Sequence, residues 1–247
     1  MLKRLRSQRF WRTLHLWLSL LLSLQIMAWF GSGLLMAWLP IEQVRGNHLT
    51  NTAVSADWRQ VQLSPAQVLA KLQTEVAAAS MVISANPAQL SLTQRGSQPV
   101  YQWQSGQHFY YLDANSGQLL APLTAAEASL LALQRYRGEA PLPQAELLQQ
   151  IPAEARGLTA PVWQLRFEDQ ENTVFYLHAN TGQLLKVRTD RWRLFDFVWM
   201  LHIMDYQERE DFNHGLLIAS SALALLFSIS GVVLLCFARK RLRPGRG

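Results

Sequence analysis

Residues 110–120 read YYLDANSGQLL, and residues 175–185 read FYLHANTGQLL. Eight of the eleven paired positions are identical, at an offset of 65 residues. Upstream, VYQW at 100–103 aligns with VWQL at 162–165 at an offset of 62. The small change in offset indicates short insertions, which loops tolerate. The chain is therefore predicted to contain a tandem structural repeat.

Each repeat is predicted to begin with a helix. SPAQ at 64–67 aligns with TAAE at 124–127 at an offset of 60, and both are capping boxes that mark a helix N-terminus. We expect helices over about 64–79 and 124–137, each with one apolar face. The residues of these faces are Val68, Leu69, Leu72 and Val76 in the first helix, and Ala128, Leu131 and Tyr136 in the second.

Antiparallel strands are predicted to follow each helix. Tyr101 and Trp103 alternate with polar residues, as in a half-buried strand. Asn-x-Gly at 115–117 and 180–182 favours tight turns. The expected strands are 88–94, 100–104, 107–113 and 119–120 in the first repeat, and 162–168, 173–179 and 184–185 in the second. The Pro-rich stretch 140–152 would link the halves, with a short helix at 143–150.

Two apolar segments flank the repeats. Residues 14–39 and 215–238 contain no Asp, Glu, Lys or Arg. The first would form a helix of roughly 39 Å, enough to cross ~30 Å of hydrocarbon. A cleaved signal peptide is the alternative for this segment, but its apolar run is too long and no small-x-small cleavage site follows. We expect two transmembrane helices that pack through small residues. These are Ser19, Ser23, Gly33 and Ala37 on the first, and Ser220, Ala224, Ser228 and Gly231 on the second.

The charge distribution predicts the topology. The 247 residues include 23 Lys+Arg and 17 Asp+Glu, a net charge of +6. Residues 1–12 and 239–247 each carry five basic residues and no acid, so the rest of the chain carries −4. Because Lys and Arg mark the cytoplasmic side, both termini are expected in the cytoplasm and residues 40–214 outside. This pattern argues against nucleic acid as a partner. The single cysteine, Cys236, excludes a disulfide framework within the chain.

Three histidines near the membrane are candidates for binding a cofactor, either haem or quinone. His15 is near the cytoplasmic end of the first span, whereas His202 and His214 are near the outer face. A membrane bis-histidine haem needs two imidazoles at one depth. Two arrangements remain: His15 with His15 in a homodimer, or His202 with His214. Polar residues at helix ends are the alternative for all three, whereas His108 and His178 fit ordinary strand positions.

The segment before the second span mixes aromatic, basic and acidic residues. It is expected to form an amphipathic helix on the outer membrane face, either as an anchor or as a docking surface for quinone, haem or a partner helix. Its aromatic face consists of Trp192, Phe195, Trp199, His202 and Tyr206. Asp205, Glu208, Glu210 and Asp211 then form an acidic cluster, read as a solvated patch or a metal site. No common hydrolase or nucleotide-binding motif is present.

Several of these patterns resemble a known family. The helix opening followed by Tyr111-Leu112-Asp113-Ala114-Asn115-Ser116-Gly117 is similar to the PepSY domain, and the second copy has His178 in place of the Asp. Trp11-Arg12-Thr13-Leu14-His15, Leu201-His202 and Ser230-Gly231 are similar to motifs of the PepSY-associated transmembrane family. The resemblance implies an inner-membrane protein with a periplasmic PepSY region, often linked to iron or siderophore uptake. Larger members look like haem-bearing ferric-siderophore reductases, but they have more spans than this chain.

The sequence thus predicts an α+β membrane protein with two transmembrane helices around two PepSY-like units. The expected segments are a basic tail at 1–13, a span at 14–39, repeat units at 40–122 and 123–188, an interfacial segment at 189–214, a span at 215–238 and a basic tail at 239–247. We expect an accessory or scaffold protein rather than an enzyme, with a membrane or periplasmic protein or a second copy as its partner. The alternatives are a small electron-transfer protein and a membrane-tethered peptidase inhibitor or chaperone.

Overall fold

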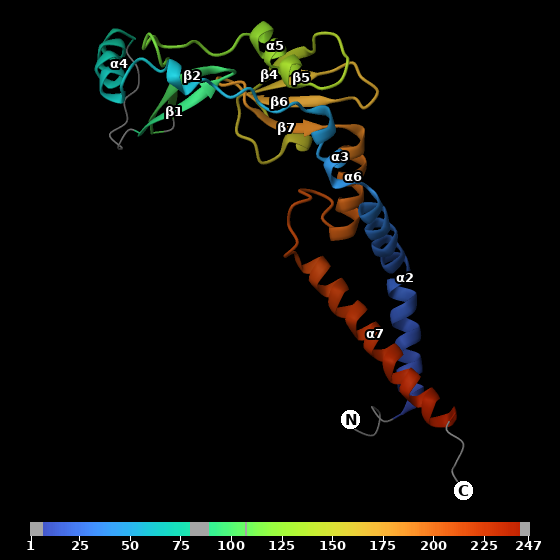
Figure 1. The fold of residues 1–247 in the computed structure, drawn as a ribbon. Coiled ribbons are helices and arrows are strands. Elements are labelled where there is room, and N and C mark those ends of the chain that lie inside the picture. Colours follow the sequence, from blue (N-terminus) through green and yellow to red (C-terminus); the bar gives the residue numbers. More distant parts are fainter. Residues whose placement is uncertain (1–6, 80–88, 107, 243–247) are drawn as a thin grey trace. The chain divides into compact units, whose positions relative to one another are not determined.

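The computed structural model describes residues 7–79, 89–106 and 108–242 and has an α+β fold (Figure 1). Two long apolar helices near the chain ends flank two small antiparallel sheets. The chain divides into two units, which we call the helical unit, Met1–Pro40 with Leu194–Gly247, and the sheet unit, Ile41–Arg193. Each unit is described separately below.

The helical unit contains two helices that are long and apolar enough to cross a membrane. They are α2, Gln8–Trp38, and α7, Gly215–Leu242. Their apolar side chains are largely exposed, with Leu24 at 80% and Leu235 at 70% of full exposure. Because such surface is unfavourable in water, it suggests that these helices anchor the protein in a membrane. The end of α6, Asp190–Ile203, also belongs to this unit.

The expected packing between the two long helices is confirmed, and part of the predicted set makes the contact: Gly231 of α7 lies against the ring of His15 on α2. Helices α2 and α7 lie side by side and run antiparallel (Figure 1). Ser23 and Ser228 are exposed and donate to carbonyls of their own helices. The buried serines are Ser32 on α2 and Ser230 on α7, at 6% and 0% exposure. The i, i+4 spacing of small residues therefore identified the two helices and the contact at Gly231, but it did not identify Ser230, which bonds His15.

In the sheet unit, a three-stranded antiparallel sheet follows the first repeat helix. Helix α4 is Pro65–Ala79, and the sheet consists of β1, Gln89–Arg95, β2, Gln98–Ser105, and β3, His108–Asp113, in that order. The predicted alternation is confirmed, since Tyr101 and Trp103 are buried beside Val68 and Leu72. Leu69, predicted on the same face, is instead 40% exposed. Leu119 makes only an isolated bridge. Residues 88 and 107 and the Val76 side chain lie outside the described part.

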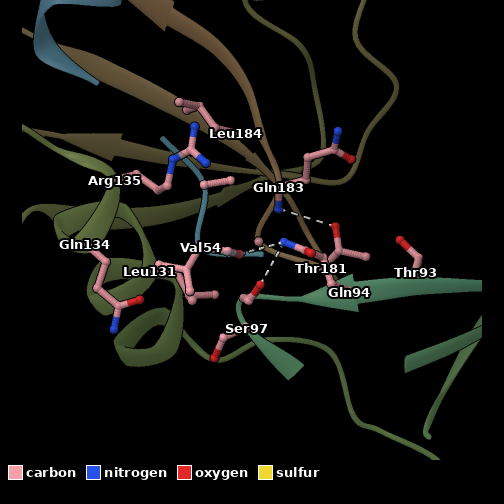
Figure 2. Close-up of a pocket in the computed structure, with 13 residues that line it drawn as sticks. Val54, Thr93, Gln94, Ser97, Leu131, Gln134, Arg135, Thr181, Gln183 and Leu184 are labelled. Carbon is pink, nitrogen blue, oxygen red and sulfur yellow. Dashed lines mark hydrogen bonds between the residues drawn. The ribbon is translucent and has the colours of Figure 1, made fainter. Parts of the chain in front are cut away.

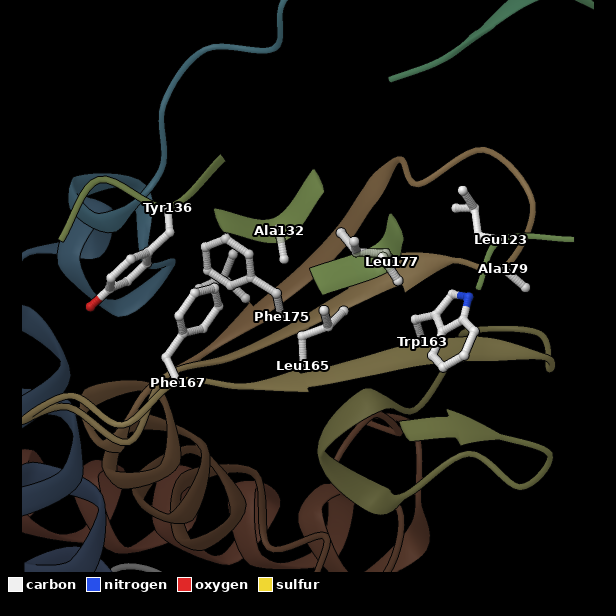
Figure 3. Packing of buried hydrophobic residues seen from close by; sticks show 11 residues of the cluster. Leu123, Ala132, Tyr136, Trp163, Leu165, Phe167, Phe175, Leu177 and Ala179 are labelled. Carbon is white, nitrogen blue, oxygen red and sulfur yellow. The ribbon is translucent and has the colours of Figure 1, made fainter. Parts of the chain in front are cut away.

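A four-stranded antiparallel sheet follows the second repeat helix. Helix α5, Ala125–Arg135, precedes β4, Gln144–Leu148, β5, Val162–Arg166, β6, Val174–His178, and β7, Leu184–Arg188, which pair in that order. Figure 3 shows the core between α5 and the sheet, where the rings of Tyr136 and Phe167 stack at 4.2 Å. The remaining short helices are α3, Ile41–Val44, and the 3-10 turns Asn47–Leu49, Trp58–Gln60 and Ala153–Ala155.

The predicted helix at 143–150 is wrong, because this segment forms the edge strand β4. Its residues pair with β5 from Gln144 opposite Arg166 to Leu148 opposite Val162. A helix of eight residues is marginal on its own, whereas the free edge of β5 offers a complete row of backbone partners. Pairing with β5 therefore decides the conformation of this segment.

Candidate functional site

His15 is held against α7 by a serine and a glycine. Its Nδ1 lies 2.8 Å from Ser230 Oγ, and its ring stacks on Phe227 with centroids 4.4 Å apart. A Cβ on Gly231 would lie 3.3 Å from Cε1 of the imidazole. Ser230 thus provides the polar partner, and Gly231 provides the space for a ring to lie close to the helix backbone.

His202 on α6 makes the same arrangement with α2. Its Nδ1 lies 2.8 Å from Ser32 Oγ, and a Cβ on Gly33 would lie 3.6 Å from its Cε1. The indole N–H of Trp29 donates to the His202 carbonyl at 2.8 Å, which fixes the backbone as well. Ser32 and Ser230 therefore each bond one histidine of a neighbouring helix, and each serine is followed by a glycine.

The bonds of the two serine hydroxyls assign a tautomer to both histidines. Ser32 donates its hydroxyl proton to the Trp29 carbonyl at 3.1 Å, and Ser230 donates to the Phe227 carbonyl at 2.6 Å. Because a hydroxyl has a single proton, Nδ1 of each histidine is assigned as the donor and Ser Oγ as the acceptor. In this tautomer the lone pair is on Nε2, the arrangement found in metal-ligating histidines. No described residue bonds Nε2 of His15 or His202.

His214 differs from the other two because both its ring nitrogens are used. Nε2 lies 2.9 Å from the Ile203 carbonyl, and Nδ1 accepts the Leu217 N–H at 3.3 Å. His214 thus caps the start of α7 and joins it to the end of α6. In this conformation it offers no nitrogen to a ligand, so a pair with His202 would require its release.

His15 and His202 lie at two different levels of α2. Seventeen residues separate His15 from Ser32, the partner of His202, along the helix. At ~1.5 Å per residue this is a rise of about 25 Å. One cofactor therefore cannot bind both imidazoles, and each level supplies one Nε2 per chain.

Within the acidic cluster, Asp205 shapes the loop between α6 and α7. The Asp205 carboxylate accepts the backbone N–H groups of Gln207, Glu208, Glu210 and Asp211 at 3.0–3.2 Å. Desolvation raises the pKa of Asp205, but these bonds outweigh it and lower the pKa to about 2. In the described ranges, no three side chains of His, Cys, Asp or Glu come together as a metal group. The carboxylate is thus used to shape the loop.

The aromatic segment forms α6, and its buried residues differ from the predicted face. Phe195, Trp199 and His202 are half-buried, Tyr206 lies beyond the helix and is exposed, and Asp196 is buried at 5% exposure. Asp196 forms an ion pair with Arg209, whose carbonyl accepts the Trp199 indole N–H at 3.1 Å. Sequence reasoning missed this pair, since no spacing rule links a helix to a later loop.

His178 has the same place in its turn as Asp113 in the first repeat. Asp113 Oδ1 accepts the N–H groups of Asn115 and Ser116 at 3.0 and 2.7 Å. His178 Nδ1 accepts those of Asn180 and Thr181, both at 3.2 Å. The two side chains thus stabilise their turns in the same way. Burial lowers the pKa of His178, which favours the neutral form that accepts these bonds.

In the sequence, each of the two histidine sites is marked only by a Ser-Gly dipeptide. Ser230-Gly231 was singled out by its resemblance to a family motif, whereas Ser32-Gly33 is equally informative and was not paired with His202. Which histidine meets which Ser-Gly pair depends on the helix packing, which the sequence pattern does not give. Comparison of the chain with protein-family models, curated proteins and solved structures gave no match.

Proposed function

We propose that this protein is a PepSY-type accessory or scaffold protein of the bacterial inner membrane that acts in iron or siderophore uptake. In this proposal both termini are cytoplasmic, and residues 40–214, with their two PepSY-like units, face the periplasm. The duplicated turn, the two apolar helices and the basic chain ends support it. The partners would be lipid and a membrane or periplasmic protein, or a second copy.

One observation favours an accessory role over an enzymatic one. The polar side chains that join the helices of the helical unit are bonded to that unit itself. His202 binds Ser32, His15 binds Ser230, and Asp196 binds Arg209. Such bonds fix helices to one another and make a firm anchor, while the sheet unit remains available for binding.

A strain lacking this chain tests the proposal. Under iron limitation with a ferric siderophore as the iron source, we expect slower growth and lower uptake of radioactive iron, restored by the full chain. The matched control is growth with excess ferrous salt, which should not differ between strains. Equal iron uptake with and without the chain would contradict the proposal.

A second candidate function, electron transfer, is favoured by the Nε2 lone pairs of His15 and His202. Both histidines have the Nδ1–H bond to a neighbouring side chain that fixes an axial ligand, so each fits one side of a haem iron. A bound haem would supply one-electron transfer. Because each level has one imidazole per chain, the second axial ligand would come from another copy or a partner. The same lone pairs could instead accept a hydrogen bond from a reduced quinone.

The absorption spectrum of the purified full-length protein tests this candidate. We expect a Soret band that is lost in His15→Ala or His202→Ala and kept in His108→Ala, because His108 lies at the exposed start of β3. A colourless protein that stays folded, purified from cells supplied with haem, would rule out the haem form.

A further inference from the structure

A cleft lies within the sheet unit where the two repeats meet. Its volume is about 580 Å³, and its walls come from the end of β1, the end of α5 and the turn between β6 and β7 (Figure 2). Small-molecule sites typically have volumes of ~300–1,000 Å³ and often lie where two substructures join. The Gly96 N–H donates to the Thr181 carbonyl at 3.2 Å, so a backbone bond joins the two repeats at the cleft.

A fourth wall of the cleft, the segment of Ala53 and Val54, is fixed by a glutamine. The Gln94 amide donates to the carbonyls of Val54 and Gly96 at 3.1 and 3.0 Å, and its oxygen accepts the Ala56 N–H at 3.0 Å. Figure 2 shows this amide between the segment of Val54 and the turn after β1. The amide of Gln94 is therefore fully used in holding this wall in place.

Arg135 is the exception among the lining residues. It is the last residue of α5, and its Nε is buried with no hydrogen-bond partner. Across the described residues, the Arg135 guanidinium forms neither a hydrogen bond nor an ion pair. Burial lowers its pKa. None of the lining residues is acidic, so the Arg135 guanidinium lies at the wall of the cleft without a carboxylate partner there, and its unpaired Nε costs free energy.

The remaining lining residues indicate the kind of anion. A single guanidinium fork matches one carboxylate, which it binds through two parallel N–H···O bonds. Leu131 and Leu184 offer apolar contact, and the amides of Gln134 and Gln183 offer hydrogen bonds. A phosphate would instead be expected to meet several cations or a helix N-terminus.

We infer that this cleft binds the carboxylate of a small amphipathic organic acid or of a peptide C-terminus, with Arg135 as its anchor. The inference goes beyond the proposed role in iron uptake and does not depend on it, because it rests on the cleft alone. It assigns the sheet unit a ligand and places that ligand between the two repeats.

Calorimetric titration of the full chain in lipid nanodiscs tests the site with two probes. The peptide acetyl-Ala-Leu and the free acid 4-methylpentanoate each carry one carboxylate, and their carboxamides are the matched neutral controls. We expect at least one acid to bind, and its amide to bind at least about tenfold more weakly. Binding of the peptide alone identifies a peptide terminus, and binding of both identifies any small acid.

Three variants separate the proposed contact from general charge. Arg135→Gln should weaken binding by about tenfold to a hundredfold, whereas Arg137→Gln, with the same charge change at an exposed position, should change it less than about twofold. Arg135→Lys keeps the charge at the end of α5 but loses the fork, so its affinity should fall between these values. Unchanged thermal unfolding of the variants establishes that they fold. Failure of both acids to bind the wild type, or equal loss in Arg135→Gln and Arg137→Gln, would overturn the inference.

Discussion

At His15 and His202, Nδ1 bonds a serine on a neighbouring helix, and the tautomer assigned from this bond places the ring proton on Nδ1. Each serine hydroxyl lies within bonding distance of a carbonyl of its own helix, and with its proton assigned there the oxygen accepts from the imidazole. The same side chain thus satisfies a polar group within the helix pair and orients the ring. This arrangement combines a structural role for Nδ1 with an unoccupied lone pair on Nε2.

The bond between Ser32 and His202 is predicted to contribute modestly to stability. A double-mutant cycle with Ser32→Ala and His202→Ala should give a coupling of about 0.6 kcal/mol, and at most about 1.7 kcal/mol, as for other hydrogen bonds between membrane helices. Reversible unfolding in mixed micelles measures it. The pair Ser23→Ala and His202→Ala is the control, because the Ser23 hydroxyl bonds its own helix. Additive effects in both cycles would contradict the assigned bond.

The stability of the sheet unit should depend on the protonation of His178. Its folded pKa is lowered by burial from the ordinary 6.5, so the unfolded chain takes up the proton first. The contribution of the neutral His178 side chain to the free energy of unfolding is complete above pH 6.5. It is lost as the pH falls from 6.5 through the lower folded pKa. Urea unfolding from about pH 7.5 to about pH 5 measures this loss.

His178→Asn is the matched variant for this test. Its amide oxygen can accept the same two backbone N–H groups but does not titrate in this range. We expect the pH dependence of stability to be smaller in the variant than in the wild type. If both lose the same stability on acidification, His178 is not the group responsible.

At the scale of elements, the strands and helices that have local signals were predicted well. The capping box at Thr124 starts α5 where expected, since it needs only residues three apart. The alternation at Tyr101 and Trp103 likewise identified β2. The strand β4 could not be predicted in this way, because its conformation comes from pairing with β5, which lies beyond the Pro-rich link.

Substitution of Gly182, at the turn between β6 and β7, is predicted to cost more stability than substitution of Gly157, which also has a positive φ. It has φ +68°, and a Cβ there would lie 2.4 Å from Leu131 Cδ1. Gly182→Ala should lower the free energy of unfolding by about 2–4 kcal/mol, from backbone strain and overpacking together. Gly157 has φ +78° with its nearest atom, Lys186 Nζ, at 3.7 Å.

The Gly157→Ala variant isolates the backbone contribution. Its free energy of unfolding should fall by only about 1–2 kcal/mol, because backbone strain is the single penalty at this position. Thermal or urea unfolding of both variants gives the comparison. Equal losses would show that Leu131 moves aside without cost and that packing at the repeat junction is loose.

At the scale of the molecule, composition predicted the two long helices, but not how they bond. Their length and lack of charge are properties of single segments, which the sequence displays directly. The pairing of His15 with Ser230 joins residues 215 positions apart, and several helical alignments would satisfy the same composition. The basic residues at 1–6 and 243–247 lie outside the described part, so their role stays a prediction from sequence.

The topology is predicted from the charges of +5 at each end and −4 between them. A phosphatase reporter at the C-terminus should be inactive in intact cells, and one inserted at Glu139, before β4, should be active, because Lys and Arg remain cytoplasmic. Replacing the basic residues of the C-terminal tail by Gln should make the orientation mixed. An active reporter at the C-terminus would reject this topology.

Helix α2 is bonded near one end to α7 and near the other to α6. A helix held at one point can still swivel, but one held at two levels about 25 Å apart cannot turn or slide without breaking both bonds. Advancing α2 by a single residue would move each contact by ~1.5 Å and rotate it by ~100°. A screw motion of α2 would therefore have to break the contacts at both levels together.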